Sequence, residues 1–398
     1  MKYCIAGKNN ISVEILEYLF YEKKIPKKNL FVCCNKSDNG VNLWQRSLRF
    51  AAKTMGIKEV SLTDIYEIED LVFLSLEFDK IINPELFKSK KLYNIHFSFL
   101  PKYKGMYTSV LPILNNESYT GVTFHFIDKG IDTGPIIAQK KIEINFNDTA
   151  RDIYLKNIFW GTQLVKECID TYLNAEFQCL SFPQTIQNSS YYSAKSIDFN
   201  NICINLNQTA LSIHNQIRAY NFREYQLPCV EGYKIRFAEI TRNRSTEKSG
   251  TILWQSDNCM MISTIDFDVV LYFDFFDRVM EACMTNDIKK LSNIAGLKNY
   301  VNEKNSHGWT PLIVATYNGL FDISMFLISQ GADIYSKNNN GTNLLMYAKD
   351  AFLKTGDDRL LKFYYSKGIS FDQKDYKGLS LIDYCDTHDI EILKEICG

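Results

Sequence analysis

The segment NIHFSFLPKYKG at residues 94–105 places an asparagine and a histidine two residues apart at the end of an apolar stretch. Side chains alternate along a β-strand, so Asn94 and His96 would project from the same face. Pro101 and Gly105 predict that the chain then leaves the strand through a turn. An imidazole can accept a proton and a carboxamide can donate a hydrogen bond to a developing oxyanion, so the two side chains could act together at a carbonyl carbon.

A third polar group, Asp132, lies in the stretch TGVTFHFIDKGIDTGPIIAQKKIEI. The pattern predicts strands at 121–127 and 135–144, joined by a turn whose glycines let the backbone approach closely. A carboxylate in that turn could orient a histidine. Spacing alone leaves an alternative open, in which His96 is a structural histidine and the DTG turn is only a hydrogen-bonded corner.

Length and composition narrow the class of protein. A chain of 398 residues predicts two or three domains, and a net charge of -1 gives no overall field that would attract nucleic acid or an anionic membrane. The 11 cysteines form no CxxC pair and the histidines show no ligand spacing, so we expect a reducing compartment and no metal. With no signal-peptide pattern and no apolar run of about 18 residues, a cytoplasmic protein is expected.

The first part of the chain alternates strand and helix patterns. Strands are predicted at 2–6, 29–34, 59–62, 72–76 and 93–97, with helices between the first two and at 43–55. This alternation predicts an α/β fold with a doubly wound, mostly parallel sheet, in which ligands bind at the carboxyl ends of strands. The stretch AGKNNI has one glycine where a dinucleotide fingerprint has three, so it predicts an ordinary βα turn.

A helical pattern from about 150 to 220 is followed by alternating segments between 233 and 273 that predict a small β subdomain. We therefore expect a catalytic domain at 1–200, a helix and β subdomain at 201–273, and a third domain at 274–398.

The third domain shows a period of 33 residues. The residues that recur are Ala282, Ala315 and Ala348, Gly308 and Gly341, and Leu312 and Leu345. With GWTPLIVA this period resembles the ankyrin repeat, although Ile313 stands where that family has His. The resemblance implies a helical array of about three stacked units, and the alternative is a nonspecific helical tail.

Together, NIHFSFLPKYKG and GVTFHFIDKGIDTGPII resemble the formyltransferase family that takes its one-carbon unit from 10-formyltetrahydrofolate. The resemblance is tight over about 70–145 and implies a Rossmann-like formyltransferase domain. It implies that His96 takes a proton from an attacking amine, that Asn94 donates to the oxygen of the tetrahedral intermediate, and that Asp132 orients His96 and stabilises its protonated form. No metal is implied.

The resemblance also implies a folate co-substrate, whose pterin would lie against the stretch LSLEFDKIINPELF. The residues expected to line it are Phe78, Asp79, Ile81 and Ile82. The alternative is that these are sheet and loop residues without ligand contact.

For the amine, balanced charge disfavours a tRNA substrate. The stretches GMYTS and WQRSL are similar to those of relatives that act on nucleotide-linked amino sugars. With ankyrin repeats appended, the chain most resembles enzymes for dTDP-3-amino-3,6-dideoxy-D-glucose. The alternatives are another nucleotide-linked amino sugar, of the dTDP-4-amino-4,6-dideoxyglucose type, and a catalytically inactive scaffold that acts through its ankyrin repeats. The resemblance implies a homodimer and a place in surface polysaccharide biosynthesis, such as that of the lipopolysaccharide O-antigen.

Such a substrate presents a diphosphate and a base, for which arginines and aromatic rings are suitable partners. The expected contacts are Lys102, Lys104, Met106, Tyr107, Thr108, Arg218, Tyr220, Phe222 and Arg223. For the segment RAYNFREYQLP the alternative is a helix end packed on the β subdomain.

In the repeats, an aromatic side chain at a loop tip could stack on a base and form a second site for a nucleotide or nucleotide sugar. The residues expected there are His307, Trp309, Tyr335, Tyr347 and Lys349. A protein-docking surface and a purely structural or dimer-supporting role are the alternatives.

Overall fold

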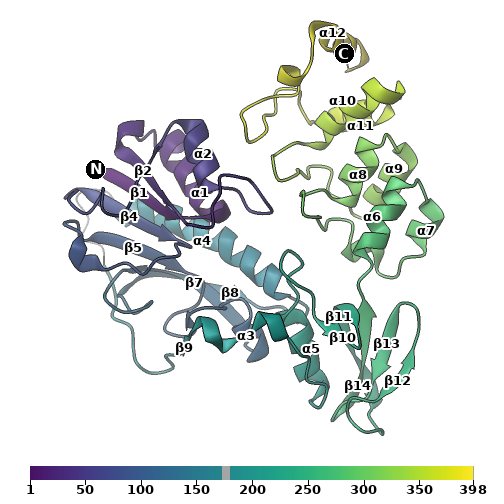
Figure 1. Cartoon of the computed structure of the whole chain (residues 1–398), viewed down its shortest axis with the longest axis horizontal. Helices are drawn as coiled ribbons and strands as arrows, with labels where there is room; N and C mark the ends of the chain where they lie inside the picture. The colour runs from purple at the N-terminus through teal and green to yellow at the C-terminus, as the bar shows by residue number, and fades with distance from the viewer. Residues whose placement is uncertain (173–179, 398) are drawn as a thin grey trace. The chain divides into compact units, whose positions relative to one another are not determined.

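The computed structural model describes residues 1–172 and 180–397 of the chain (Figure 1). They form two compact units, one of residues 1–41 and 46–274 and one of residues 42–45 and 275–398. The first unit holds the α/β domain together with the small β subdomain, so the predicted boundary between 200 and 201 stays a prediction.

A seven-stranded sheet in the order β3-β2-β1-β4-β5-β7-β8 is the centre of the described part of the first unit (Figure 1). Its strands are β1 (Lys2–Gly7), β2 (Leu30–Cys34), β3 (Lys58–Glu59), β4 (Leu71–Leu76), β5 (Lys91–His96), β7 (Tyr119–Phe126) and β8 (Ile136–Glu143). The pairs from β3 to β5 are parallel, and β7 and β8 add antiparallel strands. This confirms the predicted α/β fold with a mostly parallel sheet.

The central strands β1 and β4 are buried on both faces, which explains why they read as continuous apolar runs. Along β1, Tyr3 and Ile5 belong to one hydrophobic cluster, whereas Cys4 and Ala6 belong to the other. The main helices of this unit are α1 (Asn9–Glu17), α2 (Leu48–Met55), α3 (Leu111–Leu114), α4 (Ala150–Tyr172) and α5 (Ala210–Ala219).

Three local predictions are corrected. The helix predicted at 43–55 begins at Leu48, because the Ser47 hydroxyl accepts from the Phe50 N–H at 2.9 Å and caps it. The strand predicted at 59–62 is limited to β3. The helical pattern predicted up to 220 is interrupted, since residues 180–209 contain single turns, an isolated bridge from Phe182 to Ile136, and the short strand β9 (Tyr191–Tyr192), which pairs with β6 (Lys104–Gly105).

The β subdomain contains, within the described residues, a five-stranded sheet in the order β10-β11-β14-β13-β12. Its strands are β10 (Cys229–Val230), β11 (Tyr233–Arg244), β12 (Ile252–Gln255), β13 (Cys259–Ile262) and β14 (Phe267–Phe273). The expected subdomain is therefore present, and α5 packs against β11.

The second unit is helical, as predicted from its period. Its helices are α6 (Phe276–Met284), α7 (Ile288–Ser292), α8 (Pro311–Tyr317), α9 (Phe321–Ser329), α10 (Leu344–Thr355), α11 (Arg359–Ser366) and α12 (Thr387–Cys397). Thr310 and Asn343, which are 33 residues apart, each cap the following helix through a side-chain oxygen. The recurring Ala and Leu positions are buried, so the repeat in the sequence is a repeat in packing.

A search of the helices in the described ranges finds none with the length and apolar character of a membrane span.

Candidate active site

The catalytic pair predicted from NIHFSFLPKYKG lies on β5, at the end of the parallel part of the sheet. In the antiparallel register of β5 and β7, Asn94 is opposite His125 and His96 is opposite Thr123. The turn after β7 brings Asp132 back to these strands, with Asp132 in a left-handed backbone conformation at φ 53°. Residues that are far apart in the sequence therefore meet at one edge of the domain.

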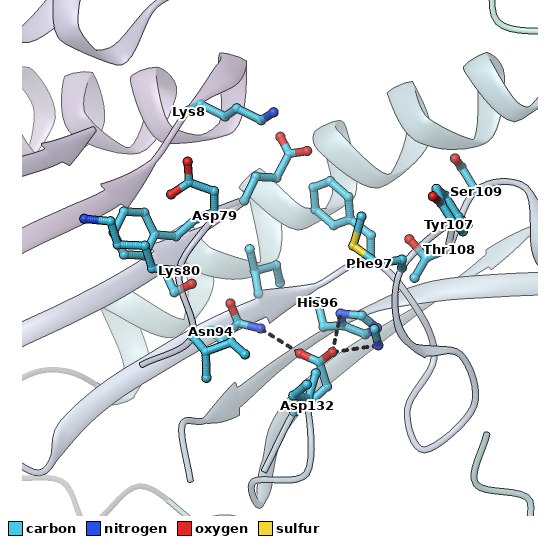
Figure 2. A pocket seen from close by; sticks show the side chains of 18 of the residues that line it. Lys8, Asp79, Lys80, Asn94, His96, Phe97, Tyr107, Thr108, Ser109 and Asp132 are labelled. Carbon is cyan, nitrogen blue, oxygen red and sulfur yellow. Dashed lines mark hydrogen bonds and ion pairs between the residues drawn. The ribbon is translucent and has the colours of Figure 1, made fainter. Parts of the chain in front are cut away.

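The three predicted catalytic side chains are in contact. Asp132 Oδ2 lies 3.4 Å from His96 Nδ1, and Asn94 Nδ2 donates to Asp132 Oδ1 at 3.3 Å. Figure 2 shows Asp132 beside both, with the nitrogen of the Asn94 carboxamide directed at it. The side chains of His96 and Asp132 are 9% and 12% exposed, so water screens their interaction only weakly.

The other nitrogen of His96 has a partner that sequence reasoning did not identify. His96 Nε2 lies 2.8 Å from the carbonyl oxygen of Tyr103. Because a carbonyl only accepts hydrogen bonds, Nε2 carries the hydrogen and Nδ1 is the basic nitrogen of the neutral ring. The Tyr103 carbonyl thus orients the imidazole, while Asp132 is placed to stabilise a proton on Nδ1.

The charge of Asp132 is fixed by its surroundings. Burial raises the pKa of this carboxyl, but the imidazoles of His96 and His125, which favour the carboxylate when they are protonated, and the Gly105 N–H outweigh burial, and the pKa lies well below its usual value. Gly105 N donates to Asp132 Oδ2 at 2.9 Å. Asp132 is therefore a carboxylate at neutral pH and favours a positive charge on a neighbouring imidazole.

Gly105 has a steric reason to be glycine. Its φ is 85°, and a Cβ at this position would lie 2.2 Å from the carbonyl oxygen of Tyr192. The same residue pairs with Tyr192 in the two-stranded ladder of β6 and β9. The loop that carries the Tyr103 carbonyl and the Gly105 N–H is thus held in place by a segment 87 residues further along the chain.

The catalytic side chains open into a cavity of about 890 Å³. Of the predicted site residues, those that line it are Asn94, His96, Asp132, Phe78, Asp79, Ile81, Ile82, Met106, Tyr107, Thr108 and Phe222. All the residues expected to meet folate are in this group. The sequence motifs therefore account for a large share of the cavity lining.

The four cationic residues expected to contact the nucleotide sugar, among them the two arginines expected at the diphosphate, do not line the cavity, which corrects that prediction. Arg218 is buried and donates to the Asn215 side chain and to the carbonyls of Asn145 and Asp148. Arg223 forms a largely buried ion pair with Asp274. The segment RAYNFREYQLP is in this respect a packed helix end.

The other two of these cationic residues, Lys102 and Lys104, lie outside the cavity lining, and so does Tyr220, which was also expected to contact the nucleotide sugar. Lys102 Nζ lies 2.9 Å from Glu117 Oε1, which also accepts from the Tyr103 hydroxyl, so this lysine helps to anchor the loop. Lys104 and Tyr220 are likewise outside the lining, although the Tyr220 ring contacts Phe199, which is part of it.

The cavity also contains a polar cluster that sequence reasoning missed. The Tyr154 hydroxyl donates to Glu77 at 2.8 Å, and Asn9 Nδ2 donates to Glu77 at 3.1 Å. Burial raises the pKa of Glu77, and the two donors act in the opposite direction. Lys8 lies beside this carboxyl and lines the cavity. The stretch AGKNNI, predicted as a plain turn, thus brings polar groups to the cavity.

His125 was also missed, although its sequence signal is visible afterwards. In TGVTFHF it follows Thr123 by two residues, so it projects from the same face of β7. It lies across the ladder from Asn94 and lines the cavity.

The residues predicted to form a second ligand site lie in the repeats. The Trp309 ring packs on those of Tyr347 and Tyr317, with centroids 5.4 and 5.2 Å away. Tyr347 and Lys349 are mostly buried, and Lys349 pairs with Asp350. His307 is exposed, and the exposed Tyr335 donates to the Lys367 carbonyl. Lys349 is therefore not available to a ligand in this arrangement, which corrects its predicted role.

The chain is similar to known proteins in two separate regions. A family model described as formyl transferase matches residues 50–168, and a model of three ankyrin repeats matches residues 279–375. Curated methionyl-tRNA formyltransferases match in sequence. The one from Clostridioides difficile is 29% identical over 203 residues, 49% of this chain and 63% of its own length. The matched region thus spans less than two thirds of that relative.

Solved structures match more of the chain. An N-formyltransferase from Helicobacter canadensis, in complex with folinic acid and dTDP-3-aminofucose, is 44% identical with a TM-score of 0.64 and covers 69% of this chain and 100% of its own. WlaRD, a sugar 3N-formyl transferase in the presence of dTDP and 5-N-formyl-THF, is 44% identical with the same TM-score of 0.64, covering 69% and 97%. With nearly half of the residues identical over a whole solved relative, the chain belongs to the formyl transferase family.

Proposed function

We propose that this chain transfers a formyl group from 10-formyltetrahydrofolate to the amino group of a dTDP-linked 3-amino-3,6-dideoxyhexose. The observation that carries the proposal is the contact of His96, Asn94 and Asp132 at the edge of a cavity that is also lined by Phe78 and Asp79. Two relatives at 44% identity, one with dTDP-3-aminofucose and one named as a sugar 3N-formyl transferase, support the dTDP group and the 3-amino position.

In the proposed reaction His96 acts through Nδ1. The amine nitrogen must be neutral to attack the formyl carbon, so Nδ1 takes the proton that the nitrogen loses as the new C–N bond forms. Asp132 stabilises the resulting imidazolium at 3.4 Å. When the bond between the formyl carbon and the folate nitrogen breaks, that nitrogen receives the proton from His96, so the enzyme returns to its starting state.

Stabilisation of the tetrahedral oxyanion is assigned to Asn94. A preorganised donor of this kind contributes about 3 kcal/mol in well-studied enzymes. Both hydrogens of the Asn94 carboxamide have protein partners, Asp132 at 3.3 Å and His125 at 3.1 Å, so donation to substrate requires that one of them be shared.

The diphosphate needs cationic partners, and with Arg218 and Arg223 engaged elsewhere we assign this role to Lys8. Of the described residues that line the cavity, Lys8 and Lys80 carry ammonium groups. Lys80 lies over the Phe78 ring, with Nζ 6.0 Å from its centroid, in the stretch assigned to folate. Lys8 lies beside the Glu77 carboxyl, outside that stretch, and is the better candidate for the nucleotide.

The experiment is mass spectrometry of an amine panel incubated with the protein and 10-formyltetrahydrofolate. The panel contains dTDP- and UDP-linked 3-amino and 4-amino sugars, in both glucose and galactose configurations, and methionyl-tRNA. We expect a dTDP-3-amino sugar to gain one formyl group fastest, with the glucose-configured sugar as our first choice. Formylation of methionyl-tRNA alone would replace this proposal with the activity of the curated relatives. The homodimer and the polysaccharide pathway stay predictions.

A further inference from the structure

We propose that His125 is a positioning residue that fixes the orientation of the Asn94 carboxamide, so that Nδ2 and not Oδ1 lies on the side of Asp132. The inference rests on the proposed function, since it assigns His125 a part in the same reaction. It concerns a residue that does not belong to the predicted trio and whose ring nitrogens lie beside Asn94, Asp132 and the Phe126 carbonyl.

The sheet register creates the pair. Asn94 on β5 and His125 on β7 are direct cross-strand neighbours, so their side chains stand beside each other on one face. His125 is only 2% exposed, and water competes little for its ring nitrogens. The distance from His125 Nε2 to Asn94 Nδ2 is 3.1 Å.

The hydrogen-bond donors and acceptors can be assigned from both ends of the ring. His125 Nδ1 lies 2.8 Å from the carbonyl oxygen of Phe126 and must donate to it, because a carbonyl only accepts. In the neutral ring Nε2 is therefore an acceptor, and it takes a hydrogen from Asn94 Nδ2. The other hydrogen of Nδ2 goes to Asp132 Oδ1 at 3.3 Å.

This arrangement excludes the flipped carboxamide. A flip would place Asn94 Oδ1 against two acceptors, the lone pair of His125 and the Asp132 carboxylate. Figure 2 shows the nitrogen of Asn94 directed at Asp132 and its oxygen directed away. With Asp132 as its sole acceptor, the Asn94 amide could shift or rotate and still keep its hydrogen bond. Two acceptors on two different elements fix both the position and the plane of the amide.

The backbone around His125 leaves room for the hydrogen bond between His125 Nδ1 and the Phe126 carbonyl. A Cβ on Gly134 would lie 1.7 Å from the Phe126 carbonyl oxygen and 3.4 Å from His125 Nδ1. The last glycine of the DTG turn therefore leaves space for the Nδ1 hydrogen bond. This gives that glycine a role that its sequence context alone did not show.

The experiment compares the variants His125→Leu, His125→Gln, Asn94→Ala and the double variant His125→Leu with Asn94→Ala. Leu removes the acceptor, whereas the Gln oxygen can take the place of Nε2. We expect His125→Leu to lower kcat about 10²-fold, because a misplaced catalytic group costs about that much, with KM for both substrates within about 3-fold. His125→Gln recovers at least about tenfold of that loss, and the double variant is no slower than Asn94→Ala within about 3-fold.

Two results would overturn the inference. If the losses of the single variants multiply in the double variant, His125 acts independently of Asn94. If Gln is as poor as Leu, acceptance at Nε2 is not its role. His214→Leu is the matched control, since His214 is also buried, at 3%, but does not line the cavity. We expect it to retain kcat.

A readout without turnover separates this inference from the proposed function and covers variants with low stability. The side-chain amide signals of Asn94 in ¹⁵N-labelled protein can be assigned by their loss in Asn94→Ala. We expect one proton of the pair to shift upfield in His125→Gln and further in His125→Leu, and unchanged signals would contradict the Asn94–His125 bond. If the wild-type protein formylates no amine of the panel, the proposed function is refuted, whereas the amide signals still show whether Asn94 and His125 are hydrogen-bonded.

Discussion

His96 Nε2 donates to the backbone carbonyl of Tyr103 at 2.8 Å, so the imidazole is held by a main-chain group of the loop that follows its own strand. Tyr103 is in a left-handed conformation at φ 60°, which is uncommon for a bulky residue and turns its carbonyl toward the ring. The loop is tied down by Glu117, which accepts from the Tyr103 hydroxyl at 2.9 Å. Orientation of the proposed base and its electrostatic support thus come from different groups.

Replacement of His96 is expected to remove most turnover. His96→Ala should lower kcat by about 10²- to 10⁴-fold, the usual contribution of a general base, while the circular dichroism spectrum stays that of the folded chain. His388→Ala is the control, since His388 is exposed on α12 in the other unit. Turnover of His96→Ala within about threefold of wild type would refute the assignment.

Asp132→Asn is expected to change how stability depends on pH. The pKa of Asp132 is lower in the folded chain than the ordinary 3.8, so the carboxylate contributes stability above 3.8 that is lost as pH falls toward the folded value. The thermal midpoint of the wild type should therefore exceed that of Asp132→Asn at about pH 7. The difference between the two midpoints should become smaller as the pH is lowered from about 5 to about 3. A difference that grows on acidification would contradict the lowered pKa.

Lys8→Ala tests the assignment of the diphosphate. Loss of a charge-assisted contact of about 1.5–3 kcal/mol should raise KM for the nucleotide sugar by about tenfold or more and leave KM for folate nearly unchanged. The control is Lys53→Ala, an exposed lysine on α2 that does not line the cavity. A rise in the folate KM alone would move Lys8 to the other substrate.

Arg223→Ala distinguishes a structural arginine from a ligand contact. It leaves Asp274, whose side chain is 7% exposed, without its ion-pair partner, so we expect a loss of about 3 kcal/mol in the free energy of unfolding. Urea denaturation measures this, with the exposed Arg242→Ala as control. An unchanged midpoint together with a tenfold higher KM for the nucleotide sugar would restore the original prediction.

Trp309→Ala tests the second ligand site proposed for the repeats. If a nucleotide sugar stacks on this ring, calorimetric titration should give two sites per chain for wild type and one for the variant. Trp254→Ala is the control, because Trp254 is 44% exposed on β12 in the other unit. Equal stoichiometry and equal kinetics would remove the effector hypothesis and leave protein docking or a structural role.

Local patterns in the sequence were sufficient to predict most strands of the sheet, the β subdomain, the repeat period and the residues of the trio. Alternation with period two places Asn94 and His96 on one face whatever the rest of the chain does. The period of 33 is likewise visible because each repeat unit has to bury the same positions. Charge and residue type were poorer guides, since Arg218 and Arg223 had suitable chemistry but inward-facing partners.

The hydrogen-bond partners of the three catalytic side chains depended on contacts between segments that are separated in the sequence. His96 meets a carbonyl seven residues away through a loop, Asp132 receives an N–H 27 residues away, and Asn94 meets His125 31 residues away. Such bonds depend on where loops place backbone groups and on how strands pair, and neither follows from periodicity within one element. The residue types of the site were therefore readable in the chain, and their hydrogen-bond directions became fixed when the sheet formed.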